Sequence, residues 1–274
     1  MINSKSIENF WTRGDIFSRV HHAMSEAGLI NKELNIEDLF PIDQYHARGI
    51  AATVDLGKRM PISKNQKIID IGCGLGGPAR YYAKEFKCFI TGIDITPSFI
   101  EIGNEFNKLT SMSDNIQLLV GNGEILDFKN ETFDGAYSQH VTMNISDRKK
   151  FFSEAFRVLK KDSFFAFTEH GLGPEGNPIF PLPWADSSEM SFLLPPETTI
   201  SILKDIGFSD IKMIETADKY ISGYEKLIGL KSANKKPILG IHVIGGESMN
   251  ERSTNSMQSI KENRTLPFEI VCKK

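Results

Sequence analysis

The chain has few cysteines, no long apolar run and almost no net charge. Its three cysteines, at positions 73, 88 and 272, are too few and too scattered for a disulfide framework or a zinc site. Its apolar runs stay below the ~18 residues of a membrane span, and its N-terminal stretch lacks the apolar core of a signal peptide. A net charge of −3 and a pI near 6.1 argue against a nucleic-acid partner held by electrostatics. We therefore expect a cytoplasmic protein with no metal, no membrane partner and no nucleic acid.

The most informative stretch that is present runs from Lys67 to Pro78. Its apolar run at 68–71 is rich in isoleucine, which is typical of a strand buried on both faces of a parallel sheet. A glycine loop follows, and Pro78 then opens a helical pattern. Strand, loop and helix start together predict a nucleotide-type site at the carboxyl end of the first strand. The loop glycines, which let the backbone turn sharply and a ligand come close, are Gly72, Gly74 and Gly76.

Two acidic residues decide which nucleotide fits this loop. Asp70 lies two residues before the first glycine, where its carboxylate would repel a pyrophosphate but would suit a ligand carrying an ammonium group. The glycine spacing is G-x-G-x-G, not the G-x-G-x-x-G of dinucleotide sites. Asp94 ends a second apolar strand about 20 residues beyond the loop, a position that hydrogen-bonds a ribose in such folds. The pattern predicts S-adenosyl-L-methionine (SAM), which has an ammonium group and a ribose but no phosphate, with NAD or another nucleotide as the alternative.

Strand and helix patterns alternate between residues 66 and 170, which predicts a parallel, doubly wound sheet. Strands are expected at 67–71, 88–94, 116–120, 133–138, 164–168, 211–215 and 268–272. The strands within the alternation deliver polar residues at their carboxyl ends, where open α/β sheets bind ligands. We expect the cofactor to be bound by Asp70, Gly72, Gly74, Gly76, Asp94, Ile95, Asn122, Gly123, Gln139 and His140.

The regions outside this alternation are expected to cover the site. Residues 1–60 precede the first strand and have helical patterns at 15–28 and 50–59, so they predict an N-terminal helical cap or lid. Residues 61–274 then form the SAM-binding domain. Within it, the stretch at about 171–196 holds six of the twelve prolines without periodicity, and about 216–266 form a long, partly helical insertion. Both insertions are predicted to act as lids.

Several motifs together resemble one enzyme family. The loop from Asp70 to Gly76, with Asp94, resembles the class I SAM-dependent methyltransferases. The whole chain resembles the type 11 group, which includes sarcosine and dimethylglycine N-methyltransferases, through motifs at 43–46, 72–79, 139–145 and 180–185. The resemblance implies a Rossmann-like α/β fold, a three-layer sandwich whose seven-stranded, mostly parallel sheet has an antiparallel last strand. It also implies methyl transfer from SAM to a small molecule, with S-adenosyl-L-homocysteine as the product.

Two positions depart from the pattern of this family. The family's third strand usually ends in Gly-Asp, whose aspartate accepts a bond from the adenine amino group. Here the pair is Gly121-Asn122, and an asparagine oxygen still accepts that bond. The turn before the fifth strand usually carries Pro-Gly-Gly and here is Lys161-Asp162-Ser163, a change that we expect to alter loop geometry but not chemistry.

The candidate catalytic residues are His140, Glu169 and Tyr45. Methyl transfer requires the acceptor to be aligned with the S–CH3 bond and water to be excluded. An amine acceptor needs only to be unprotonated, whereas a hydroxyl or carbon acceptor requires a base. By resemblance to sugar O-methyltransferases, Glu169 stands where those enzymes place an acidic partner and Asn144 where they place a histidine, which argues against base-driven O-methylation. Alternatively, His140 packs against the methionine part of SAM, and Glu169 and His170 cap a turn.

The acceptor is expected to meet polar and aromatic side chains near the mouth of the site. Arg48 is the nearest candidate for binding a substrate carboxylate, and the rings of Tyr45, Phe180 and Trp184 are candidates for cation–π contact with an ammonium product. Alternatively, these side chains cap a helix or only cover the lid. The predicted substrate-binding residues are Gln44, His46, Arg48, Asn144, His170, Phe180 and Trp184.

The preferred function is SAM-dependent methylation of a small-molecule amine similar to sarcosine or dimethylglycine. Two alternatives stay open: an O- or C-methyltransferase of a natural-product pathway, and a SAM-binding protein without transferase activity. The cofactor residues favour SAM binding in all three cases, so they do not separate them. The sequence identifies neither the acceptor nor the oligomeric state.

Overall fold

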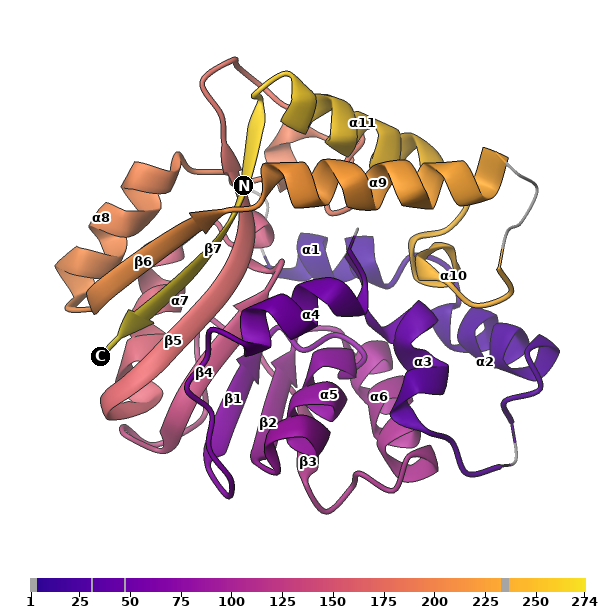
Figure 1. Ribbon diagram of the computed structural model, residues 1–274, viewed down its shortest axis with the longest axis horizontal. Helices are drawn as coiled ribbons and strands as arrows, with labels where there is room; N and C mark the ends of the chain where they lie inside the picture. Colours follow the sequence, from indigo (N-terminus) through magenta and orange to yellow (C-terminus); the bar gives the residue numbers. More distant parts are fainter. Residues whose placement is uncertain (1–3, 31, 47, 233–236) are drawn as a thin grey trace.

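A single mixed sheet forms the centre of the molecule (Figure 1). The computed structural model describes residues 4–30, 32–46, 48–232 and 237–274. The sheet has seven strands in the order β3-β2-β1-β4-β5-β7-β6, and β7 runs antiparallel to both of its neighbours while the other pairs are parallel. This confirms the predicted Rossmann-like sheet with an antiparallel last strand. The strands are β1 (Lys67–Ile71), β2 (Phe89–Asp94), β3 (Ile116–Val120), β4 (Phe133–Gln139), β5 (Leu159–Leu172), β6 (Ser209–Glu215) and β7 (Thr265–Lys273).

Helices cover both faces of the sheet. Successive residues of a strand point to opposite faces, and apolar residues on both faces have to be buried against helices. On one face Ile69 and Ile71 of β1 pack in one cluster with Phe151 of α7 (Arg148–Val158). On the other face Ile68 packs in a second cluster with Tyr82 of α5 (Gly77–Phe86). Within the described ranges, no helix is long and apolar enough to cross a membrane. The remaining helices beside the sheet are α6 (Pro97–Leu109), α8 (Pro196–Ile206) and the short 3-10 helices η1 (Thr142–Asn144) and η2 (Ser188–Met190).

Helices from both ends of the chain lie beside the carboxyl ends of the parallel strands (Figure 1). The predicted helix at 15–28 is α2, which begins after Asp15, whose carboxylate accepts from the backbone of Ser18 at 2.9 Å. From the other end, α10 packs against α2 and α3, and α9 packs against α11. The sequence did not predict α1, α9 or α10, and the division into cap and domain stays a prediction. These helices are α1 (Ser4–Trp11), α2 (Ile16–Glu26), α3 (Ile36–Asp43), α4 (Ile50–Gly57), α9 (Ala217–Ser232), α10 (Ile241–Gly245) and α11 (Met249–Lys261).

A buried arginine on α5 joins the N-terminal helices to the glycine loop. The Arg80 guanidinium donates to Asp43 Oδ2 at the end of α3 at 3.1 Å and to Asn107 Oδ1 on α6 at 2.7 Å. It also donates to the carbonyl of Leu75, inside the glycine loop. A Cβ placed on Gly77 would lie 2.2 Å from the carbonyl oxygen of Asp43, so α3 and the start of α5 meet backbone to backbone. Helix α3 is therefore fixed directly to the glycine loop.

We expect Gly77→Ala to destabilise the fold, because the new methyl group meets backbone atoms that cannot rotate away. The free energy of unfolding should fall by about 1–3 kcal/mol, as is usual for overpacking. Urea denaturation of wild type and variant measures this difference.

The matched control is Gly229→Ala on α9, where a Cβ would meet nothing within 4 Å. Removing a helical glycine there should leave stability unchanged or raise it by up to ~1 kcal/mol. Equal effects of the two substitutions would contradict the close contact between α3 and α5.

Candidate functional site

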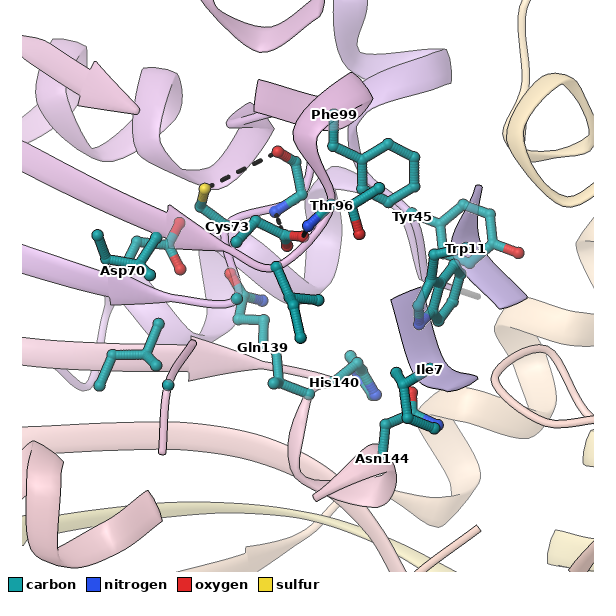
Figure 2. Close-up of a pocket in the computed structure, with 18 of the residues that line it drawn as sticks. Ile7, Trp11, Tyr45, Asp70, Cys73, Thr96, Phe99, Gln139, His140 and Asn144 are labelled. Atoms are coloured by element: carbon teal, nitrogen blue, oxygen red, sulfur yellow. Dashed lines mark hydrogen bonds between the residues drawn. The ribbon is translucent and has the colours of Figure 1, made fainter. Parts of the chain in front are cut away.

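A cavity opens at the carboxyl ends of β1, β2, β3 and β4, beside the helical cap (Figure 2). Asp70 lies at one end, Trp11 and Tyr45 lie at the other, and Gln139 and His140 lie between them. The strand ends therefore converge as the sequence indicates. The predicted cofactor residues in the lining are Asp70, Gly72, Gly74, Asp94, Ile95, Asn122, Gly123, Gln139 and His140.

The three loop glycines have different surroundings, although each has a positive φ. A Cβ on Gly72 (φ +87°) would lie 2.1 Å from Val141 Cγ2, so this glycine allows the loop to pack against the chain after β4. Gly76 (φ +77°), which does not line the cavity, starts α5 and lies close to Leu118. Gly74 (φ +52°) has nothing within 4 Å of its Cβ position. Gly74 is therefore the point where a ligand can approach the loop backbone.

Four carboxyl groups of the described residues line this cavity: Asp43 and Asp70 are buried, whereas Asp94 and Glu124 are partly exposed. Asp94, at the end of β2, accepts from the backbone N–H groups of Gly74 and Thr96, each at 2.9 Å, and its burial raises its pKa. Asp70 accepts from the Tyr137 hydroxyl at 2.8 Å. Burial, with a contribution from the charge of Asp94, raises the pKa of Asp70 to about 8, although the Tyr137 bond opposes the shift. Asp70 is thus a buried acid that a cationic ligand would help to ionise.

Two glutamine amides lie together at the wall of the cavity. The Thr53 hydroxyl donates to Gln44 Oε1 at 2.6 Å, and Gln139 Oε1 lies 3.4 Å from the same hydroxyl. The amide nitrogens of both glutamines are buried without a partner among the described residues. Gln139 lines the cavity, so its amide is a donor for a ligand. Gln44, predicted to bind substrate, lies behind the wall.

A second cavity adjoins the first and is mostly aromatic. The two cavities share Trp11, Tyr45, His46 and His140. A nucleophile in the second cavity would therefore lie next to a ligand in the first. Among the described residues, those that line the second cavity include no carboxylate, lysine or arginine. The full lining is Trp11, Tyr45, His46, His140, Met143, His170, Pro183, Trp184, Tyr220, Tyr224, Ile241 and Met249.

Three imidazoles give the second cavity its polar character. The ring of His140 lies 5.5 Å from that of His46 and 5.6 Å from that of His170, and its Nε2 contacts the Tyr220 hydroxyl. Burial lowers the pKa of His46 and of His170 to about 3, and that of His140 well below its usual value. Both ring nitrogens of His46 and Nδ1 of His170 are buried without a partner in the described part of the chain. All three rings are thus neutral at pH 7, and His46 and His170 have nitrogen atoms without a partner that could bond a ligand.

These histidines do not form a metal site in the described ranges. No group of three or more histidine, cysteine, aspartate or glutamate side chains there is arranged to hold an ion. The three cysteines are buried and unpaired.

The structure corrects the expected position of Glu169. β5 continues to Leu172, so Glu169 lies within the strand and not at its end. Its carboxylate is fully buried, paired with Arg148 at 2.5 Å, and accepts from the hydroxyls of Thr142 and Thr199. Glu169 lines neither cavity, and its bonds assign it to stabilising the loop after β4.

Arg48 and Phe180 also differ from expectation, because neither lines the two cavities. The Arg48 guanidinium pairs with Asp55 and lies 3.5 Å from Glu269 Oε1, in a network that also includes Lys219 and Arg59. Phe180 packs in an apolar cluster with Trp184. Trp184 does line the second cavity, where its ring lies 4.7 Å from that of His170.

Asn144 lies at the first cavity, but its amide nitrogen already donates to two backbone carbonyls. It donates to the carbonyls of Trp184 at 2.9 Å and Met190 at 3.1 Å, and so orders the loop that follows β5. Asn144 therefore shapes the site by fixing this loop.

Sequence reasoning expected residues 1–60 and about 216–266 to cover the site, but it did not identify the side chains of α1, α9 and α11 that line the second cavity. Trp11 comes from α1, Tyr220 and Tyr224 from α9, and Met249 from α11. The two tyrosines stand four residues apart, a spacing that places both on one face of a helix. This spacing could have indicated a helix with a tyrosine face, but it does not indicate which part of the protein that face packs against.

The comparisons with known proteins identify the central part of the chain. Residues 69–167 match the family described as "Methyltransferase domain". This part of the chain is therefore similar to a methyltransferase domain. This stretch includes the glycine loop, Asp94, and the ends of β3 and β4 that line the first cavity.

Curated relatives carry names with different acceptors, a sterol in one case and phosphoethanolamine in another. A sterol 24-C-methyltransferase of Debaryomyces hansenii is 32% identical over 114 residues, which are 42% of this chain and 30% of that protein. The chain spans about a third of the length of such curated relatives.

Two solved structures share the fold over nearly the whole chain. The Haemonchus contortus phosphoethanolamine N-methyltransferase 2, in complex with phosphomonomethylethanolamine and S-adenosylhomocysteine, has a TM-score of 0.79 and 18% identity, covering 100% of this chain and 61% of that one. A candidate sarcosine dimethylglycine methyltransferase of Galdieria sulphuraria has a TM-score of 0.71 and 16% identity, covering 94% and 98%. At these identities the likeness concerns the fold.

The buried histidines predict a specific loss of stability in acid. The folded protein keeps His46 and His170 unprotonated down to a pKa of about 3, whereas the unfolded chain protonates them near ~6.5. Between these values the unfolded state binds more protons, so the free energy of unfolding falls as the pH is lowered. Each histidine contributes up to ~1.4 kcal/mol per pH unit.

We expect His170→Gln to reduce this pH slope by about one proton. Urea denaturation at pH 7, 6 and 5 measures the slope, and the control His22→Gln changes an exposed histidine on α2. If His170→Gln and wild type lose stability in parallel, His170 is not held neutral by burial.

Proposed function

We propose that this protein transfers the methyl group of SAM to a small-molecule amine. The observation that carries the proposal is the junction of two unlike cavities, which share Trp11, Tyr45, His46 and His140. The first contains buried carboxyl groups beside an open glycine loop, and the second contains aromatic rings and neutral imidazoles.

The residues of the first cavity fit SAM. When bound, SAM supplies a methyl group activated by its sulfonium. The carboxylate of Asp94 suits ribose hydroxyl groups, and that of Asp70 suits the ammonium group, which favours its ionised form. Gly74 allows close approach, and the unpartnered amide of Gln139 suits the ligand's carboxylate. The Asn122 side chain, at the end of β3, is the candidate for the adenine amino group.

The second cavity favours an uncharged amine as the acceptor. A buried site disfavours an ammonium ion, so it selects the unprotonated form that acts as the nucleophile. The aromatic faces of Trp11, Trp184 and Tyr220 then suit the positive charge that develops on the nitrogen. Such a contact stabilises a cation by about 0.5–2 kcal/mol. These contacts offset part of the cost of forming the ammonium product in a buried site.

The histidines support positioning over base catalysis. Burial lowers the pKa of His140, and the neighbouring His46, His170 and Arg48 lower it further, so His140 is a weak base. A weak base serves an amine, which needs only a hydrogen-bond acceptor, better than a hydroxyl group, which must lose a proton. We assign His140 and Tyr45, which line both cavities, to aligning the acceptor with the bound cofactor.

A carbon acceptor is the second candidate. Met143, Ile241 and Met249 give the second cavity an apolar side that suits a hydrocarbon substrate. Aromatic rings would also stabilise a carbocation formed by methylation of an alkene. An apolar acceptor that releases S-adenosylhomocysteine while amines do not would favour this candidate.

We expect SAM and S-adenosylhomocysteine to bind wild type in calorimetric titration, and Asp94→Ala to raise both dissociation constants at least tenfold (~1.4 kcal/mol). The reason is the loss of a carboxylate that accepts charge-assisted bonds, worth ~1.5–3 kcal/mol each. The control Asp134→Ala removes an acid at the start of β4, paired with Lys160. Wild type that binds neither ligand would refute the proposed cofactor, and NAD would be tested next.

Turnover separates an amine acceptor from a hydroxyl acceptor. We expect the protein to form S-adenosylhomocysteine when it is incubated with SAM and a panel of small amines. His140→Gln should lower kcat less than tenfold, because His140 positions the acceptor. A base-driven reaction would instead lose about 10²–10⁴-fold. His22→Gln is the control. A loss of that size on an amine substrate would show that His140 acts as a base.

A further inference from the structure

A third cavity lies against the other two and is lined by arginines. It shares Trp11 and Tyr45 with both of them. Its guanidinium groups come from the turn after α1, from α2 and from α11, and among the described residues its lining includes no carboxylate. The full lining is Phe10, Trp11, Arg13, Arg19, Tyr45, Pro183, Ile244, Gly245, Gly246, Ser248 and Arg252.

Backbone carbonyl groups hold two of these guanidinium groups in place. Arg19 donates to the carbonyls of Val243 and Ile244, each at 3.1 Å. Arg252 donates to the carbonyl of Leu182 at 2.7 Å, while its Nε donates to Ser248 Oγ at 2.9 Å. A carbonyl orients a guanidinium without cancelling its charge. The positive groups are therefore positioned before any ligand binds, which lowers the cost of binding.

The arginines outnumber the carboxylates around them. Asp186 pairs with Arg13 at 2.6 Å and also with Arg252. Asp15, at the start of α2, interacts with Arg19 through its charge. Two carboxylates thus face three guanidinium groups in the described part of the chain, and one positive charge is left without a counter-charge.

The positive field reaches the wall of the acceptor cavity. Burial raises the pKa of Tyr45, and the charges of Arg252 and Arg13 act against that shift. Tyr45 lines all three cavities, and its ring packs edge-on against Trp11 with centroids 5.5 Å apart. Trp11 and Tyr45 thus separate the second cavity from the third, and a small molecule with an amine in the second cavity would reach the arginines past these two rings.

We propose that the third cavity binds an anionic group of the acceptor, a carboxylate or a phosphate, through Arg13, Arg19 and Arg252. This inference rests on the proposed function, because it assigns the far end of the molecule whose amine is methylated. The acceptor is then a small amine that also carries a negative charge. Arg48, which the sequence suggested for this task, lines none of the three cavities.

The test is calorimetric titration of inorganic phosphate, and separately of acetate, into the full chain with S-adenosylhomocysteine present, at constant ionic strength set with KCl. We expect at least one anion to bind, and Arg13→Gln to raise its dissociation constant at least tenfold. Arg13 is 49% exposed, so its replacement spares the core. Arg252→Lys, which keeps the charge but loses the planar donors, should weaken binding less than Arg13→Gln does. The control is Arg264→Gln, an arginine paired with Glu262 away from the cavity.

The outcomes separate the possible ligands. Binding of phosphate alone assigns a phosphorylated acceptor, and binding of acetate alone assigns a carboxylate. Binding of neither anion, or equal binding by wild type and Arg13→Gln, overturns the proposal. The binding of S-adenosylhomocysteine is measured in the same samples before anion is added. Its failure would refute the proposed cofactor and not the anion site.

Discussion

The buried guanidinium of Arg80 is the contact on which the site depends. It links the glycine loop, α3 and α6 through Leu75, Asp43 and Asn107. Removing one partner of a buried ion pair leaves an uncompensated charge and costs about 3–5 kcal/mol. The glycine loop that lines the first cavity and the N-terminal helix α3 are therefore held by the same side chain.

Charge is separated among the three cavities. Carboxyl groups such as Asp70 line the first, neutral imidazoles such as His140 line the second, and arginines such as Arg252 line the third. Buried charges interact strongly at low dielectric, so separating them lets each cavity favour a different part of a ligand pair. A cationic cofactor, an uncharged nucleophile and an anionic substituent would each meet a matching environment. This arrangement is the physical basis of the proposed reaction.

The corrected residues have a common explanation. Glu169 and Arg48 are charged side chains near the predicted mouth, and both turn out to be buried in ion pairs, with Arg148 in one case and with Asp55 in the other. The sequence does not show whether a charged side chain is paired, because its partner can come from a distant segment that only folding brings close. The predicted position of Glu169 also depended on where β5 ends. The apolar run stops at Thr168, but the strand continues to Leu172, so the sequence pattern did not show its end.

The sequence by itself determined the sheet, the glycine loop and the cofactor cavity. These features rest on local patterns, because apolar runs form strands and glycine alone tolerates the turn at Gly72. Tertiary structure decided which side chains line the second cavity, where we propose that the acceptor binds. Tyr220, Met249 and Trp11 come from opposite ends of the chain, and helical periodicity does not specify which surface a helix meets. Long-range packing brought them together, and it also decided which arginines kept an unbalanced charge.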